Sequence, residues 1–349
     1  MKIVRSVLLF CLTLCLALSL FSCGYRAEPS TAEEAAAVMT LDGKYSVPYE
    51  LFRFIFLQKK QAESGGDENY FKDKDKEALF HAFSEEAEAE ALKVYALFSL
   101  CEKYGIDPYS EEVEEEIEEE IALLIEGDDY TAGYGNYKSY LADIKEQFLN
   151  DSVYRLYLRY DACERRLAAK LKADKVITSP WEDVFAYYYG DETVCVSWIL
   201  IPYGNLGNYT EAMRQDLLNE AKGKTDEAFK QKAAEYAITQ SAEELARGVY
   251  FGRYEYDELY DELVDTAFAL EEGETSELFF SGDGLYILRR LPKDIQYISR
   301  EENRDAFNEG YMLNLFGKML ADEEARLSET LVYTDTYRAL DFDAIKMPD

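Results

Sequence analysis

The sequence predicts an α+β fold, in which a helical domain is interrupted by a small domain of mixed strands and helices. Residues 40–175 carry apolar side chains mostly at helical spacing. Residues 194–201 instead form an almost continuous apolar and β-branched run, which is typical of a central strand. Residues 300–320 carry so broad an apolar face that we expect this last helix to pack back on the first helical block.

The composition excludes several classes of function. The 349 residues include 70 Asp and Glu, 37 Lys and Arg and one His, which gives a formal net charge of −33. Nucleic-acid binding is excluded, because contacts to phosphate need clustered Lys and Arg. A site with two imidazole ligands is excluded as well, since the chain has one His. No P-loop, GxSxG or EF-hand motif is present, so we expect no metal and no cofactor.

The first residues predict export. Two basic residues precede an apolar run over 7–20, which is too short for a comfortable membrane span. The run ends in LFSC at 20–23, which resembles a bacterial lipobox, where the Cys becomes the lipidated N-terminus after cleavage. We therefore expect a signal peptide at 1–22, lipidation of Cys23, and a tether at 23–39 on the extracytoplasmic face of a bacterial membrane, at the cell surface or in the periplasm. An ordinary secretory signal, or an uncleaved anchor with a chance Cys, is the alternative.

The predicted helical domain covers 40–190. An Asp-Gly turn predicts a short hairpin over 40–45, and broad apolar faces predict helices over 49–60 and 77–104. The glutamate-rich stretch 110–127 reads as a solvated amphipathic helix and not as a metal site. Its apolar stripe consists of Val113, Ile117, Ile121 and Leu124. Two more helical stretches lie within 140–172. Ser179 as the N-cap and Pro180 in the first turn predict the start of a helix that ends near Tyr189.

The predicted mixed domain covers 191–292. Its first strand is followed by Thr210 and Thr225, each of which looks like a helix N-cap with acidic residues after it. Strand patterns return at 277–280 and 285–290, on either side of a Gly-Asp-Gly turn. A C-terminal part, 293–349, opens with Ser299 in an expected capping box and continues as the long apolar-faced helix.

Residues 194–292 resemble the parvulin-type peptidyl-prolyl isomerases. The leading strand is similar to that of the family, and later segments match in the same order: the helix at 227–236, a glycine-containing loop at 247–254, the segment DTAFALEEGETS at 265–276, and a closing strand at 284–288. The preceding helices, around 103–120, resemble the helical chaperone domain of SurA- and PrsA-like foldases. The resemblance implies a helical chaperone-like domain with an inserted βα3β-type isomerase domain.

The resemblance also implies a site. The positions that hold the proline ring in the family correspond to Phe251, Leu259, Leu263 and Phe268. The polar positions have changed, because Trp198 and Tyr286 stand where the family usually carries two His, and Thr239 stands near its Asp or Cys. We expect a degenerate catalytic site in which Tyr286 and Thr239 are the remaining hydroxyl donors, and Ser197 lies nearby in the sequence as a further candidate. The one His, His81, lies in the helical block, where a helix-surface or core role is expected.

These observations predict a lipid-anchored folding factor for secreted proteins. Its partners would be unfolded or extended secreted polypeptides, including X-Pro segments, and the membrane through Cys23. Isomerisation of an X-Pro bond crosses a barrier of about 20 kcal/mol without breaking a bond, so a catalyst needs a dry ring pocket and donors for the twisted amide. With the donors largely replaced, a non-catalytic holdase that uses the same fold is the alternative. A solute-binding lipoprotein would need two α/β lobes, which the helical first half argues against.

Overall fold

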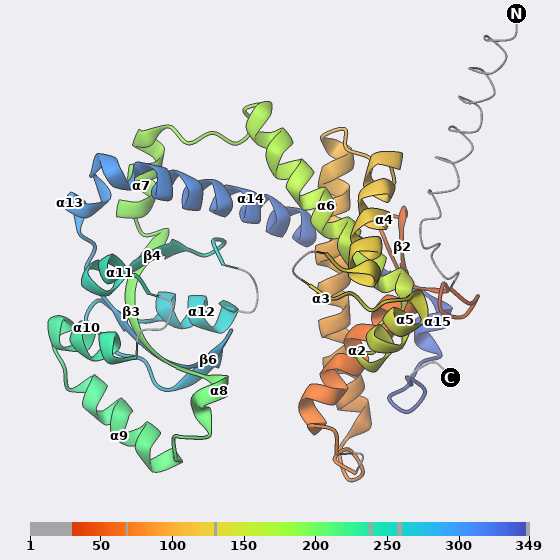
Figure 1. Ribbon diagram of the computed structural model, residues 1–349, viewed down its shortest axis with the longest axis horizontal. Coiled ribbons are helices and arrows are strands. Elements are labelled where there is room, and N and C mark those ends of the chain that lie inside the picture. The colour runs from red at the N-terminus through yellow and green to blue at the C-terminus, as the bar shows by residue number, and fades with distance from the viewer. Residues whose placement is uncertain (1–29, 68, 129–130, 237–239, 257–259, 347–349) are drawn as a thin grey trace, which may run out of the picture. The chain divides into compact units, whose positions relative to one another are not determined.

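The computed structural model describes residues 30–67, 69–128, 131–236, 240–256 and 260–346 (Figure 1). The chain divides into two compact units. Unit 1 contains the residues up to 171 together with those from 320 onward, and unit 2 contains residues 172–319. The fold is α+β, as the sequence predicts, because helices predominate and each unit also contains a small antiparallel sheet. The leader and Cys23 lie outside the described residues.

The sheet of unit 1 joins the two ends of the chain. It has the order β2-β1-β7, with β1 at Ala37–Leu41, β2 at Tyr45–Pro48 and β7 at Val332–Tyr333. The predicted hairpin is confirmed, since Asp42 and Gly43 turn the chain with φ of 56° and 60°. Strand β1 begins two residues before the end of the expected tether at residue 39, and it buries Val38 and Met39 completely.

Between the β1–β2 hairpin and unit 2, the described residues form five helices. Helix α4, Glu111–Glu126, is amphipathic as predicted, but the fourth residue of its buried stripe is Ile125 and not Leu124, because the stripe follows a strict four-residue spacing. Arginines of α6 form ion pairs with its glutamates, which explains how the acidic face is accommodated. The other helices are α2, Tyr49–Ser64; α3, Lys76–Lys103; α5, Tyr137–Glu146; and α6, Asp151–Ala173.

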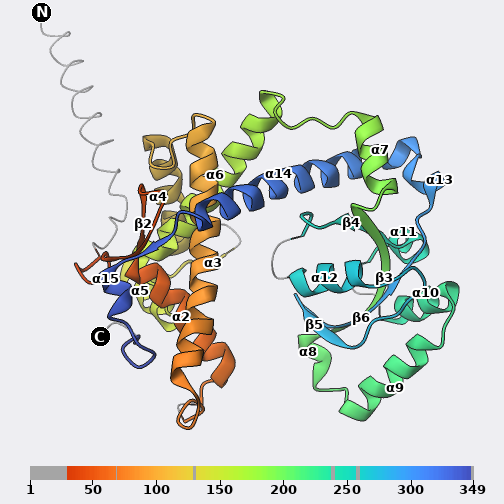
Figure 2. The same ribbon diagram turned by 180° about the vertical axis from the view of Figure 1, so that it is seen from behind.

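Unit 2 is built on a four-stranded antiparallel sheet in the order β4-β3-β6-β5 (Figure 2). The predicted strands are present, and the segment 247–254, expected as a loop, contains a further strand, β4. The strands are β3, Thr193–Pro202; β4, Val249–Gly252; β5, Phe279–Ser281; and β6, Gly284–Arg290.

Short helices connect these strands. Thr210 and Thr225 are N-caps of α9 and α10, as predicted, and each hydroxyl accepts a bond from a backbone N–H of the first turn. The helices of unit 2 are α7, Trp181–Tyr189; α8, Tyr203–Leu206; α9, Glu211–Lys222; α10, Asp226–Glu235; α11, Ala242–Arg247; α12, Asp261–Ala269; and α13, Ile295–Ile298. The 3-10 turn η2, Glu301–Asn303, leads into α14, Arg304–Ser328, which belongs to unit 2 up to residue 319 and then to unit 1.

Two predicted caps are wrong. The N-cap of α7 is Pro180 and not Ser179, and no side chain bonds to that helix end. Ser299 does not open a capping box, because Asp294 caps the one-turn helix α13 and Ser299 lies at its C-terminal end. A capping box is present at Ser241 and Glu244, at the start of α11.

Strand β3 contributes side chains to two separate hydrophobic cores of unit 2, because its side chains alternate between the two faces of the sheet. Val194, Val196 and Leu200 contribute to a core with α12. Ile199 and Ile201 contribute to a core with α9 and α10. Among the described residues, no helix combines the length and the apolar character that crossing a membrane requires.

Candidate functional site

The candidate site is an aromatic cluster on the α12 face of the unit 2 sheet. Trp198 of β3 and Tyr286 of β6 lie on adjacent strands with their ring centroids 6.3 Å apart and their planes at 68°. The ring of Tyr286 also stacks on Phe279 of β5, at a centroid distance of 5.8 Å. Offset and edge-to-face pairs of this kind are each favourable by about 0.5–1.5 kcal/mol beyond their burial. Three strands thus present one continuous aromatic surface.

The predicted ring-binding residues lie on the same surface. Phe251 reaches it from β4 and Leu263 from α12, and both belong to the core that contains Tyr286. Phe268 packs against this core from the end of α12. Leu259 and Thr239 lie outside the described residues. The structure therefore brings five of the seven predicted residues together, while their roles in binding and catalysis stay predictions.

The cluster is closed in this conformation. Phe251 and Leu263 are each only 1% exposed, and the ring of Tyr256 stands edge-on to Phe251 at a centroid distance of 5.0 Å. Tyr260 packs beside Tyr256 at 5.5 Å. Full burial of a Phe or Leu side chain contributes about 1.5–3 kcal/mol, so separating these residues without replacing their contacts is unfavourable. An incoming proline ring reaches Phe251 only if a neighbouring side chain moves and the ring takes its place.

The polar half of the site is already engaged. The Tyr286 hydroxyl donates a hydrogen bond to Oδ1 of Asp283 at 2.5 Å. Burial, reinforced by this carboxylate, raises the pKa of Tyr286, so the phenol stays protonated. Ser197 is not an additional donor, contrary to expectation, because it is fully buried on the opposite face of β3 from Trp198.

A cation that the sequence did not single out lies at the rim. The guanidinium carbon of Arg253 lies 4.2 Å from the ring centroid of Phe268. Its Nη1 atom is 3.4 Å from Oδ1 of Asp265, at an exposed position. Such a group combines cation–π contact with donors that suit a peptide carbonyl. Arg253 directly follows Gly252, the last residue of β4. Its position in the loop that resembles the family was the one feature of the sequence that could have indicated a role at the site.

A partly buried carboxylate holds the chain segment that directly follows β4. Glu255 accepts hydrogen bonds from the hydroxyls of Tyr187 and Tyr188, at 2.9 and 3.0 Å, and from the backbone N–H of Gly252 at 2.8 Å. Burial raises the pKa of Glu255, although these three donors oppose the effect. A Cβ atom on Gly252 would lie 1.5 Å from the Tyr187 hydroxyl, so the glycine is required here. The network ties the segment that carries Tyr256 to helix α7.

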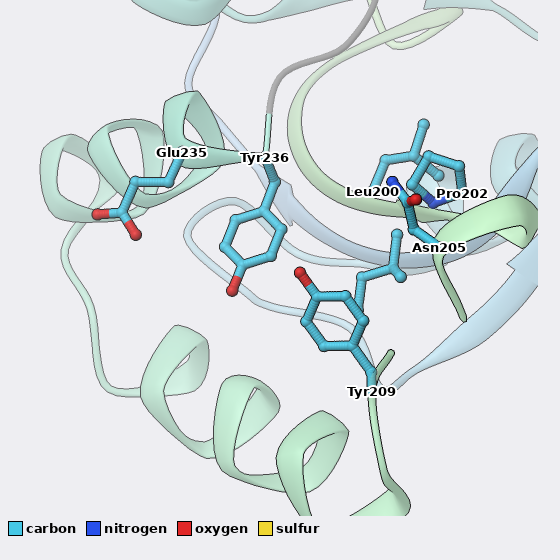
Figure 3. A pocket seen from close by; sticks show the side chains of 7 residues that line it. Leu200, Pro202, Asn205, Tyr209, Glu235 and Tyr236 are labelled. Atoms are coloured by element: carbon cyan, nitrogen blue, oxygen red, sulfur yellow. The ribbon is translucent and has the colours of Figure 1, made fainter. Parts of the chain in front are cut away.

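A second hollow opens at the end of β3 (Figure 3). Its volume is about 190 Å³. The rings of Tyr209 and Tyr236 lie 6.5 Å apart, and both line the hollow (Figure 3). Glu235 and Asn205 add polar groups, so the hollow suits a polar side chain or a backbone segment. Within the part of the chain that the structure describes, no group of three or more His, Cys, Asp or Glu is placed to hold a metal ion.

Comparison with known proteins gives structural neighbours only. No family model matches, and no curated protein matches. Among solved structures, the chain is similar to the foldase protein PrsA from Streptococcus pneumoniae str. Canada MDR_19A, with 18% identity and a TM-score of 0.33 over 74% of this chain and 92% of that one. It is also similar to PrsA from Bacillus subtilis, with 16% identity and a TM-score of 0.25 over 72% and 86%.

A third neighbour comes from the SurA-like chaperones PEB4 and Cj1289 of Campylobacter jejuni. It shows 14% identity and a TM-score of 0.28, and covers 86% of this chain and 99% of that one. These three neighbours are PrsA and SurA-like proteins.

The Glu255 network predicts a pH dependence of stability. An unfolded Glu titrates near pH 4.5, and burial raises the pKa of Glu255 in the folded state. The folded state therefore holds the proton more tightly, and this contribution to stability is present below about pH 4.5 and is lost as the pH rises through the folded pKa. We expect the free energy of unfolding of the natural chain, relative to that of Glu255→Gln, to fall over this window, by about 1.4 kcal/mol for each tenfold difference in proton affinity.

Urea denaturation from pH 4 to pH 8 measures the effect. The control is Glu262→Gln, which removes an exposed glutamate of α12. The free energy of unfolding of this variant should change with pH as that of the natural chain does, apart from the general effect of removing one charge. If Glu255→Gln has the same pH profile as Glu262→Gln, the burial of Glu255 has no energetic consequence and the account of the network is wrong.

Proposed function

We propose that this chain is an extracytoplasmic protein-folding factor whose unit 2 binds extended, proline-containing polypeptide on the aromatic face of its sheet. The observation that carries the proposal is the meeting of Trp198, Phe251, Leu263, Phe268 and Tyr286 in one cluster. These residues come from the strands β3, β4 and β6 and from helix α12, which are spread over residues 193–290. A shared apolar surface is the first requirement for holding a proline ring away from water.

The same residues favour binding over efficient catalysis. A catalyst of the twisted amide needs donors that are free to meet the amide as it rotates. The two positions that usually carry His are filled by an indole and by a phenol whose hydroxyl is bonded to Asp283. The ring-binding side chains are covered, so part of any binding energy goes into opening the cluster. We therefore propose weak or altered isomerase activity at most.

The charge of the chain indicates its clients. At −33, the surface attracts basic polypeptides over long range and repels other copies of itself. The many aromatic side chains, 29 Tyr and 19 Phe, provide adaptable contacts for apolar segments. Basic secreted chains in an unfolded state combine both properties, and we propose them as the partners.

Trp198 allows a direct test of binding, because the chain has only two Trp. In a Trp181→Phe chain, Trp198 is the single indole, and it is partly exposed at the cluster. A basic peptide with one X-Pro bond should shift its emission to shorter wavelength, since the bound peptide removes water from the ring. The matched Trp198→Phe chain, which keeps Trp181, should show no shift. A shift of equal size in both chains, or in neither, contradicts binding at this face.

Turnover separates the proposal from its alternative, a holdase without catalysis. The chain without residues 1–22 is added to a peptide whose X-Pro bond relaxes from cis to trans, and the relaxation rate is compared with that in buffer. A measurable increase, lost in Tyr286→Phe, supports a residual isomerase. A rate equal to buffer, together with suppression of client aggregation by the same chain, leaves the holdase.

We propose lipid attachment at Cys23, on the sequence of the leader. When the whole chain is produced in a bacterium, mass spectrometry of the N-terminal peptide should find Cys23 as the first residue with acyl chains attached. Cys23→Ser should release the protein from the membrane fraction, whereas Cys15→Ser, inside the leader, should not. Cleavage that leaves an unmodified Cys23, or retention of the leader, contradicts the anchor.

A further inference from the structure

The last described residues of the chain are held in place without belonging to a helix or strand. After α15, Asp335–Arg338, the segment 340–346 contains only a turn. Phe342 is 3% exposed and Ile345 is fully buried, whereas Asp341 and Asp343 are exposed. The segment therefore inserts two apolar side chains and leaves its carboxylates at the surface. This is how a short peptide binds a groove.

The groove lies on the α2–α3 hairpin of unit 1, and both ribbon views place the C-terminal segment beside α2 (Figure 1 and Figure 2). The ring of Phe342 packs against Phe56 of α2, Phe71 of the connection and Phe83 of α3. The centroid distances are 5.7, 5.1 and 5.9 Å, and all three pairs are tilted or edge-to-face. Aromatic rings from three parts of the hairpin thus pack around the single ring of Phe342.

Two lysines complete the contact. The ammonium of Lys60 lies 4.2 Å from the Phe342 ring centroid and donates to its backbone carbonyl at 3.3 Å. The ammonium of Lys76 donates to both carboxylate oxygens of Asp343, at 2.8 Å each. The hairpin thus binds the segment through an aromatic ring, a backbone carbonyl and a neighbouring carboxylate. A separate peptide with the same groups could make each of these contacts without being joined to α15.

The segment leaves part of the groove empty. A hollow of about 360 Å³ lies between it and α3, with Phe80, His81 and Leu340 in its walls. Lys76, Glu77, Asp341 and Asp343 give this hollow a mixed charge. A second hollow of about 180 Å³ also borders Lys60 and Phe71, and Leu57 and Phe148 complete its apolar wall. A longer or bulkier peptide therefore finds room for side chains that the C-terminal segment does not supply.

From these contacts we infer that the α2–α3 hairpin is a binding groove for an extended peptide with an aromatic residue flanked by a carboxylate, and that the segment 340–346 occupies it in cis. A client of this kind competes with the segment. The groove selects against basic peptides, since Lys60 and Lys76 face the occupant. Its preference is thus opposite to that of the remainder of the chain, whose net negative charge attracts basic peptides. The inference rests on the proposed function only in taking unfolded polypeptide as the natural ligand.

The test uses the chain with residues 340–349 removed and a labelled peptide of the sequence LDFDAIK, which reproduces 340–346. Fluorescence anisotropy should show saturable binding to the shortened chain. Binding should be weaker by about tenfold or more, equivalent to 1.4 kcal/mol, to the intact chain and for a peptide with Ala at the Phe position. Lys76→Gln in the shortened chain should weaken binding several-fold, whereas Lys59→Gln, beside the groove and paired with Glu86, should not.

Circular dichroism shows whether the shortened chain is folded, so that a loss of binding is not confused with unfolding. If the shortened chain is folded and binds neither peptide, or if the intact chain binds the peptide equally well, the inference is wrong. If the shortened chain unfolds, the intact chain with Phe342→Ala takes its place, and failure of that folded variant to bind the peptide overturns the inference in the same way. The result is independent of the tryptophan titration, because that experiment reports on unit 2 and this one on unit 1.

Discussion

The burial of β3 on both faces is the constraint on which unit 2 depends. Ten residues form this strand, and its neighbours β4 and β6 pair with it over most of its length. One face packs on α12 and the other on α9 and α10, so a one-residue slip in register would exchange the two cores. The alternation also decides the chemistry. It places Trp198 on the aromatic face and Ser197 on the other, and it thus leaves the candidate site poor in free hydroxyl donors.

The closed aromatic cluster and the Glu255 network belong to the same segment of chain. Tyr256 covers Phe251, and the residue before it is held by two tyrosine hydroxyls of α7. Whatever moves this segment uncovers the ring-binding residues. When its own side chains fill a binding site, the protein is more stable without ligand, but its affinity for the ligand is lower. Such a site suits transient contact with many peptide sequences better than tight binding of one.

Much of this could be predicted from the sequence. The apolar β-branched run at 194–201, the two Thr caps and the Gly-Asp-Gly turn were readable because each has a local cause in backbone preference or periodicity. The face shared by Phe251, Leu263 and Phe268 followed from resemblance to a family and not from periodicity. Sequence gave the wrong cap at Ser299, because Asp294, five residues earlier, caps a one-turn helix that has too few residues for a periodic signal.

The remainder depended on contacts between distant residues. Nothing near Glu255 in the sequence indicates that Tyr187 and Tyr188, almost seventy positions earlier, would bind it. Likewise, Phe342 meets Phe56 and Phe83 across more than 250 positions, and no local pattern encodes such a meeting. Tyr256, Tyr260 and Phe279 were missed for the same reason, since a tyrosine or phenylalanine in a chain with 48 of them carries little information by itself.

The central claim is that polypeptide binds the aromatic face of the unit 2 sheet. Hydrogen exchange of backbone amides, with and without a basic X-Pro peptide, tests it most directly. The account predicts slower exchange in β4 and α12, within 249–269, and unchanged exchange in the acidic helix α4, Glu111–Glu126. Unchanged exchange throughout 249–269, while the peptide protects other parts of the chain, would contradict it.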